Sequence, residues 1–234
     1  MNVEVLADFE AVAGKAASVI ADFARQAVGD RGKFVMAVSG GRTPWTMLRA
    51  LAARDVPWPA VHIVQVDERI APAGHTDRNL THLTEALFGH APLRPEQVHA
   101  MPVESGDPSA AASRYAATLL EIAGSPAVLD LVHLGLGADG HTASLVPGDP
   151  VLNVDAADVA LTGVYQGRRR LTLTYPILNR ARRVLWVVTG SEKVDAYHRL
   201  LRGDRSIPAG RIRCGGAMVL ADCAAAGEGE RSCV

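Results

Sequence analysis

The sequence is short of cysteine, of aromatic residues and of excess charge of either sign. Its 234 residues include 3 cysteines, 5% aromatic residues, and 24 basic against 25 acidic side chains, a formal net charge of −1. Cys214, Cys223 and Cys233 are too few and too late in the chain for a disulfide framework, which indicates a reducing compartment. Balanced charge argues against a nucleic-acid partner, because duplexes are bound through many Lys and Arg contacts to phosphate.

Long hydrophobic runs are missing as well. No charge-free stretch approaches the roughly 18 residues that a membrane span requires, and the N-terminus has no basic segment leading into an apolar one. We therefore expect a cytoplasmic protein without a membrane partner. The chain is long enough to bury roughly 70–75% of its unfolded surface, so its core needs neither disulfides nor a structural metal.

Apolar periodicity switches repeatedly between the strand and helix patterns. Helices are predicted at 8–28, with Asp8 as N-cap and Gly29 as the stop, at 43–54 with Thr43 as N-cap, and at 79–88, 108–123 and 192–201. Strands are predicted at 34–38, 61–66, 128–134, 159–164, 171–174, 184–188 and 218–221. The alternation predicts an α/β fold, a three-layer, Rossmann-like, mostly parallel sheet with helices on both faces. Residues 1–223 would form one domain, and 224–234 a flexible tail.

Three polar segments directly follow predicted strands. They are Ser39-Gly40-Gly41-Arg42-Thr43, Asp67-Glu68-Arg69 and Gly135-Leu-Gly-Ala-Asp-Gly-His141. Ligands of such sheets bind at the carboxyl ends of the strands, near a topological switch point. The three segments therefore predict one site, although each alone could be an ordinary turn.

The first segment is typical of an anion site. Its two glycines let backbone N–H groups approach a ligand, and the following helix adds a partial positive charge at its N-terminus. The Gly-Lys-Ser/Thr ending of a Walker A loop is absent. Arg69 and Lys193, each just beyond a predicted strand, could add cations to the same site.

The third segment contains G-x-G-x-x-G, so a dinucleotide site is an alternative. Pro147 and Pro150, however, end any helix within about two turns, which argues against NAD(P). His141, with Asp139 two residues earlier, is the best candidate for a general base, since imidazole titrates near pH 6.5. Neither H-E-x-x-H nor G-x-S-x-G occurs, and we expect no metal and no cofactor.

Together with Arg170-Leu-Thr-Leu-Thr174 and Gly190-Ser-Glu-Lys193, these motifs resemble the 6-phosphogluconolactonase family, a relative of the glucosamine-6-phosphate deaminases. The most specific part is Asp139-Gly-His-Thr-Ala-Ser-Leu145. The resemblance implies a deaminase/isomerase-like fold. It also implies hydrolysis of 6-phospho-D-glucono-1,5-lactone to 6-phosphogluconate, a step of the oxidative pentose phosphate pathway, with a small phosphorylated lactone as the partner.

The resemblance also implies roles for individual residues. His141 corresponds to the general base, Asp139 to the group that orients it and Asp67 to an active-site carboxylate. Phosphate and substrate ligands would come from Arg69, Lys193 and the loop of Ser39, Gly40, Gly41, Arg42 and Thr43. Arg170 matches the arginine of the family's R-x-T-L-T motif and is counted with these ligands.

Two departures and several alternatives remain. Before Pro147 this chain has Val146, where deaminases carry an acidic residue and many lactonases have Phe. The Ser-Asn pair of the lactonases appears here as Arg78-Asn79. The alternatives are a deaminase-like enzyme and a non-catalytic phosphosugar-binding protein. The sequence assigns no role to Arg168 and Arg169, and we expect a monomer or weak homo-oligomer.

Overall fold

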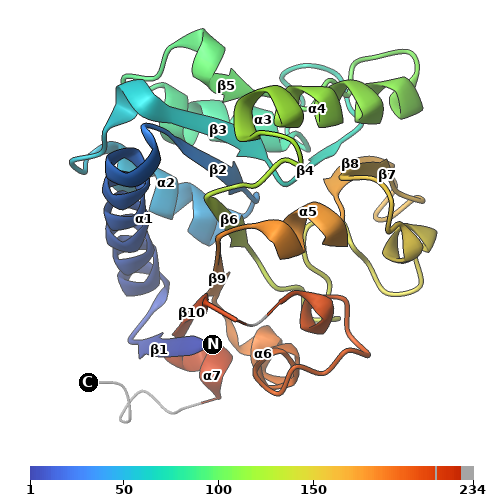
Figure 1. Cartoon of the computed structure of the whole chain (residues 1–234). Coiled ribbons are helices and arrows are strands. Elements are labelled where there is room, and N and C mark those ends of the chain that lie inside the picture. Colours follow the sequence, from blue (N-terminus) through green and yellow to red (C-terminus); the bar gives the residue numbers. More distant parts are fainter. Residues whose placement is uncertain (214, 228–234) are drawn as a thin grey trace.

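Seven parallel strands form the central sheet of the computed structural model, which describes residues 1–213 and 215–227 (Figure 1). Their order is β1-β10-β9-β6-β2-β3-β5. The bounds are β1 Asn2–Leu6, β2 Phe34–Val38, β3 Val61–Gln65, β5 Val98–His99, β6 Leu131–Leu134, β9 Arg183–Val188 and β10 Ala217–Asp222. A second, antiparallel sheet of three strands has the order β4-β8-β7, with β4 Asp67–Arg69, β7 Val159–Leu161 and β8 Arg170–Leu173.

Helices cover both faces of the large sheet, as predicted (Figure 1). The helices are α1 Phe9–Arg31, α2 Arg42–Ala52, α3 Asn79–Leu83, α4 Pro108–Ala123, α5 Tyr175–Arg180, α6 Val194–Leu201 and α7 Cys223–Ala226. A π-helical turn, Thr84–Phe88, extends α3, and short 3₁₀ helices include Pro150–Asn153 and Ser191–Lys193. No helix in the part of the chain described is both long and apolar enough to cross a membrane.

Strand β2 shows why the three layers form. Alternate side chains of a strand point to opposite faces, and all five residues of β2 are apolar and buried. Phe34 and Met36 pack into the core under α1 and α2, whereas Val35 and Ala37 pack into the core that contains α4, α5, α6 and the small sheet. A strand that is apolar on both faces is stable only when both faces are covered.

Several helix ends differ from the sequence prediction. Asp8 is the N-cap of α1, as predicted, and its carboxylate accepts a hydrogen bond from the backbone N–H three residues on, at 2.8 Å. The helix continues past Gly29 and ends at Gly32, whose φ of 75° is the left-handed conformation that glycine adopts at low cost. Helix α2 begins earlier than predicted, because its N-cap is Gly41 and Thr43 lies inside its first turn.

Other differences concern whole elements. The polar segment 67–69, predicted as a loop, is strand β4, and the sequence did not indicate β1, β5, α5 or α7. Residues 224–226, predicted as part of a flexible tail, belong to α7, in which Ala225 and Ala226 are buried. Residues 228–234 of that predicted tail lie outside the described residues.

Cys223 is disulfide-bonded, whereas the small number of cysteines indicated a reducing compartment. Cys214 and Cys233 lie outside the described residues.

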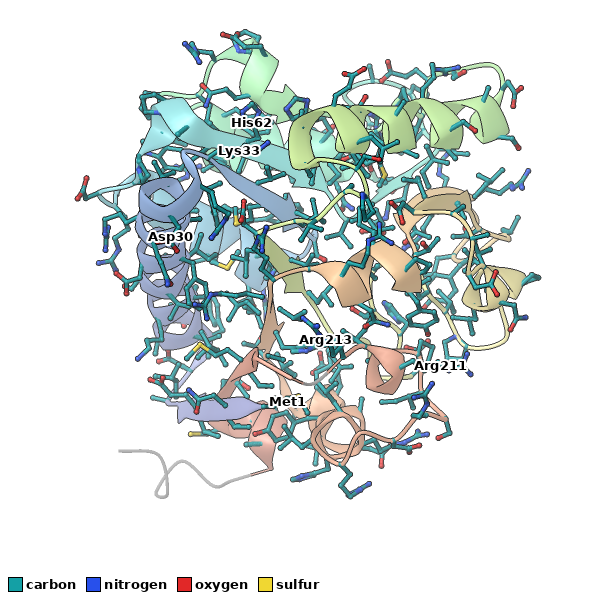
Figure 2. All side chains as sticks on the ribbon, in the orientation of Figure 1. Met1, Asp30, Lys33, His62, Arg211 and Arg213 are labelled. Carbon is teal, nitrogen blue, oxygen red and sulfur yellow. The ribbon has the colours of Figure 1, made fainter. Side chains whose placement is uncertain are left out.

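The strand order places a topological switch point between β2 and β6. After β2 the chain adds β3 and β5 on one side; after α4 it returns to add β6, β9 and β10 on the other side. The loops that leave β2 and β6 therefore diverge and open a crevice at the carboxyl ends of these strands. Lys33 and His62 lie at the other end of these strands, next to the amino ends of β2 and β3 (Figure 2).

Candidate active site

A cleft of about 350 Å³ lies at the carboxyl ends of β2, β6 and β9. Its walls come from the loop after β2, from β4 and β8 of the small sheet, from the loop after β6, and from the turn after β9. Among the predicted site residues, those that line it are Ser39, Gly40, Gly41, Arg42, Thr43, Asp67, Arg69, His141, Arg170 and Lys193. Asp139 does not line the cleft but lies against His141. The fold thus brings together the segments that the sequence predicted to meet.

His141 and Asp139 form a tight pair at one wall. Asp139 Oδ1 lies 2.6 Å from His141 Nδ1 and also accepts a hydrogen bond from the His141 backbone N–H at 3.1 Å. Partial burial alone would raise the pKa of Asp139, but the N–H and the charge of His141 hold this pKa below its usual value. Asp139 is therefore a carboxylate at neutral pH. It favours the tautomer of His141 with the proton on Nδ1, which leaves Nε2 free to accept a proton.

Gly137 makes room for this pair. A Cβ atom at Gly137 would overlap the His141 imidazole and would lie 2.6 Å from Asp139 Oδ1. Gly137 N–H also donates to the His141 carbonyl at 2.8 Å, which closes the turn that holds the imidazole. Gly137, the second glycine of the motif, therefore serves the geometry of His141. The motif does not lead into a dinucleotide-binding helix, since residues 142–149 form turns and one isolated β-bridge, between Thr142 and Leu145.

We predict that Gly137→Ala lowers kcat by about 10²-fold, because displacing a catalytic group by about 1 Å costs a factor of that order. The measurement is steady-state hydrolysis of the lactone substrate proposed below, with melting temperature as the check on folding. Gly106→Ala is the matched control, because a Cβ atom there meets no atom within 4 Å. Equal kcat for both variants would contradict the role of Gly137.

Two glycines shape the backbone of the loop after β2. A Cβ atom at Gly40 would overlap the Asn79 amide, and Gly41 has a φ of 132°, outside the range of ordinary L-residues. Thr43 is buried, and its hydroxyl lies 2.7 Å from that of Thr189. The backbone of 40–43 and the start of α2 thus face the cleft, as an anion site requires.

Ser39 lines the cleft, but its donors point into the protein. Its N–H donates to His133 Nδ1 at 3.3 Å, and its hydroxyl donates to the His133 carbonyl at 3.0 Å. Complete burial lowers the pKa of His133 to about 4, so the ring is neutral and able to accept from Ser39. Ser39 therefore fixes the loop from beneath and offers no hydrogen-bond donor to a ligand in this arrangement.

Asn79 also lines the cleft, although the sequence predicted no role for it. Its Oδ1 accepts from Arg69 Nη1 at 2.6 Å, and its Nδ2 donates to the backbone carbonyl of Asp67 at 3.0 Å. Asp67 is buried, and its Oδ2 accepts from the Ser144 hydroxyl at 2.5 Å. The signals for Asn79 and Ser144 were their positions in the family-like segments 78–79 and 139–145.

Glu68 and Arg78 support this wall from behind. Glu68 is fully buried and accepts backbone N–H bonds from Arg69, Asn79 and Leu80, each at 2.8 Å. It thereby binds the first N–H groups of α3, a task that a capping side chain performs in other helices. Arg78 Nε lies 3.1 Å from Glu68 Oε2, and Arg78 does not line the cleft. Arg78, which departs from the family pattern, therefore pairs with the buried carboxylate of Glu68.

Cations concentrate in the cleft. Arg69 and Arg170 lie directly opposite each other on β4 and β8, a pairing of like charges that is unfavourable without an anion. Burial and the neighbouring charge of Arg69 lower the pKa of Arg170, although Asp67 opposes the shift. Lys193 lines the other side of the cleft, 3.6 Å from Glu192. The site is therefore built to attract a negatively charged ligand.

The remaining arginines differ in position. Arg42 lines the cleft, with its guanidinium 5.3 Å from the centre of the Phe9 ring. Arg168 forms an ion pair with Asp77 at 2.9 Å, and Arg169 donates to the Thr162 carbonyl at 3.2 Å. These two arginines do not line the cleft. The described residues contain no group of three or more His, Cys, Asp or Glu side chains able to hold a metal ion.

A family model described as glucosamine-6-phosphate isomerases/6-phosphogluconolactonase matches residues 7–220. The chain belongs to this family. A member named 6-phosphogluconolactonase from Synechocystis sp. is 35% identical over 199 residues, which covers 83% of this chain and 82% of that protein. A member of the same name from Mycobacterium leprae is 33% identical and covers 89% and 90% of the two chains.

Two solved structures share the whole fold. The 6-phosphogluconolactonase from Thermotoga maritima superposes with a TM-score of 0.83 at 26% identity, over 94% of this chain and 98% of that one. A monomeric glucosamine-6-phosphate deaminase gives a TM-score of 0.83 at 20% identity, over 97% and 99%. Because both activities occur on one fold, the choice between them depends on the side chains of the cleft.

Proposed function

We propose that this chain hydrolyses 6-phospho-D-glucono-1,5-lactone to 6-phosphogluconate, a step of the oxidative pentose phosphate pathway. The observation that supports this most is that His141, paired with Asp139, lines the same cleft as the loop 40–43 and four cationic side chains, those of Arg42, Arg69, Arg170 and Lys193. The similarity to proteins named 6-phosphogluconolactonase points in the same direction.

The reaction needs one activated water and one site for the phosphate. His141 Nε2 takes a proton from water as the water oxygen bonds to the lactone carbonyl carbon. The carbon–oxygen bond of the ring then breaks, and the His141 imidazolium returns the proton to the departing ring oxygen. Arg170 lines the cleft and offsets the negative charge that develops on the carbonyl oxygen, whereas Arg69 is assigned to the phosphate. No electron transfer takes place, so the reaction calls for no redox cofactor.

The phosphate group supplies binding and position. Its charge of about −1.5 to −2 at neutral pH matches the backbone N–H groups of 40–43 and the ammonium of Lys193. A substrate bound through its phosphate holds its carbonyl next to His141. Much of the entropic cost of bringing the carbonyl and the imidazole together is then met by binding.

The decisive experiment is hydrolysis of freshly generated 6-phosphogluconolactone, corrected for spontaneous opening at controlled pH. We expect acceleration by the protein and no release of ammonia from glucosamine 6-phosphate. Binding of 6-phosphogluconate without acceleration would indicate a phosphosugar-binding protein instead. Ammonia release would indicate a deaminase.

Removing the phosphate ligand Lys193 should change substrate binding more than chemistry. We predict that Lys193→Ala raises KM by roughly 10- to 100-fold, because a hydrogen bond to a charged group is worth about 1.5–3 kcal/mol and about 1.4 kcal/mol corresponds to tenfold. The effect on kcat should be smaller, since phosphate contacts are present in both ground and transition states. Lys15→Ala, which removes a lysine paired with Glu4 at 2.8 Å, is the control. An unchanged KM would contradict the anion assignment.

A further inference from the structure

Tyr165 lies between the two groups that flank the reacting end of the cleft. Its ring centroid is 5.6 Å from that of His141, and the two rings meet edge to face at 64°. The guanidinium carbon of Arg170 lies 5.0 Å from the centroid of the same ring. No motif in the sequence includes Tyr165, and the residue does not itself line the cleft.

The hairpin that carries Tyr165 has a defined geometry. Tyr165 and Arg168 exchange backbone hydrogen bonds of 2.9 and 3.2 Å across a two-residue turn. The central residues, Gln166 and Gly167, have φ angles of 52° and 76°, as the tight hairpin turn of type I′ requires. Gln166 Oε1 also accepts from Arg170 Nη2 at 3.1 Å. The turn therefore holds Arg170 through both the Tyr165 ring and the Gln166 amide.

The charges around Tyr165 fit this arrangement. Burial and the carboxylate of Asp139 raise the pKa of Tyr165, so the phenol is neutral at physiological pH. Its ring face can therefore carry the guanidinium of Arg170 as a cation–π partner. Arg170 is buried, and its Nε–H has no hydrogen-bond partner within the described chain. The guanidinium is thus held on two sides, by the Tyr165 ring and the Gln166 amide, while Arg170 lines the cleft.

We propose that Tyr165 is a positioning residue that holds the His141 imidazole and the Arg170 guanidinium in a fixed relation beside the reacting carbonyl. This inference rests on the proposed lactone hydrolysis. The ring edge limits rotation of His141 away from Asp139, because edge-to-face packing favours one relative orientation. The ring face sets the position of Arg170. Tyr165 itself does not touch the substrate.

The test separates the aromatic ring from the hydroxyl group. Tyr165→Leu removes both aromatic contacts, and we expect kcat to fall by about 10²-fold, the effect of misplacing a catalytic group by about 1 Å. The KM should stay close to that of the wild type, because Lys193 and the loop 40–43 are unchanged. Tyr165→Phe keeps the edge and the face, loses only the interaction of the hydroxyl with Asp139, and should retain most of kcat. Val164→Ala, at a neighbouring side chain that is 71% exposed, controls for disturbance of the hairpin.

A second measurement does not depend on activity. The ¹⁵N chemical shifts of the His141 ring report its tautomer, and we expect a single form with Nδ1 protonated in the wild type and Tyr165→Phe, and a mixture in Tyr165→Leu. A Leu variant with wild-type kcat and a single tautomer would overturn the inference. A Phe variant as impaired as the Leu variant would overturn the role of the ring. If the wild type does not hydrolyse the lactone, the proposed function fails, while the ¹⁵N shifts still test the positioning.

Discussion

His141→Ala is expected to lower kcat for lactone hydrolysis by about 10²–10⁴-fold, the usual contribution of a general base. His141 Nδ1 is held by Asp139 at 2.6 Å, and the remaining ring nitrogen is the group available to activate water in this wall of the cleft. Rates are to be measured above the spontaneous reaction, with freshly prepared substrate. Titration with 6-phosphogluconate should show that binding is largely retained, because the phosphate ligands are unchanged.

The matched control is His90→Ala, at an exposed histidine in the turn that follows the π-helical segment. It should have wild-type kcat and KM. Wild-type turnover by the His141 variant would refute the assignment of the base. If the His141 variant lost both turnover and the binding of 6-phosphogluconate, His141 would be a binding group and not the base.

Glu68→Gln is expected to destabilise the fold by about 3–5 kcal/mol, the cost of removing one member of a buried ion pair. Each Glu68 oxygen accepts from at least two donors, Oε1 from the N–H groups of Arg69 and Asn79, and Oε2 from Leu80 N–H and Gln65 Nε2. An amide NH₂ in place of either oxygen would face donors only. Arg78, itself buried, would lose the negative charge 3.1 Å from its Nε.

The measurement is the free energy of unfolding from urea titration, of which domains of this kind have only about 5–15 kcal/mol. Glu85→Gln is the matched control, because its side chain is 69% exposed; it should change stability by no more than about 0.5 kcal/mol. If the two variants unfolded at the same urea concentration, the buried carboxylate would not have the structural role assigned to it.

Elements with a strong local pattern were predictable. The bounds of β2 and α4 agree with the prediction, because a continuous apolar run sets the first and Asp107-Pro108 marks the start of the second. The end of α1 was not predictable from Gly29, since only the tertiary structure decides which of two nearby glycines takes the left-handed conformation. Strand β5 has just two residues, and the carboxylate that anchors α3 comes from a different element.

In the site, too, some features could be predicted from the local sequence and others depend on the tertiary structure. The convergence of the loops after β2 and β6 could be predicted, because the carboxyl ends of parallel strands meet at one edge. The contacts of Asn79, Ser39 and Tyr165 could not, since each depends on a partner that is distant in sequence: Arg69, His133 and His141 respectively. Polar side chains without a motif of their own become informative only when their partners are known.

The hydrogen bonds between Ser39 and His133 join β2 to β6 where the two loops diverge. The anion loop continues from Ser39, and the segment with His141 begins two residues after His133. Neighbouring strands lie about 4.8 Å apart, a spacing fixed by backbone hydrogen bonds. The sheet thus fixes, relative to each other, the starting points of the loop proposed to bind phosphate and of the segment that carries His141.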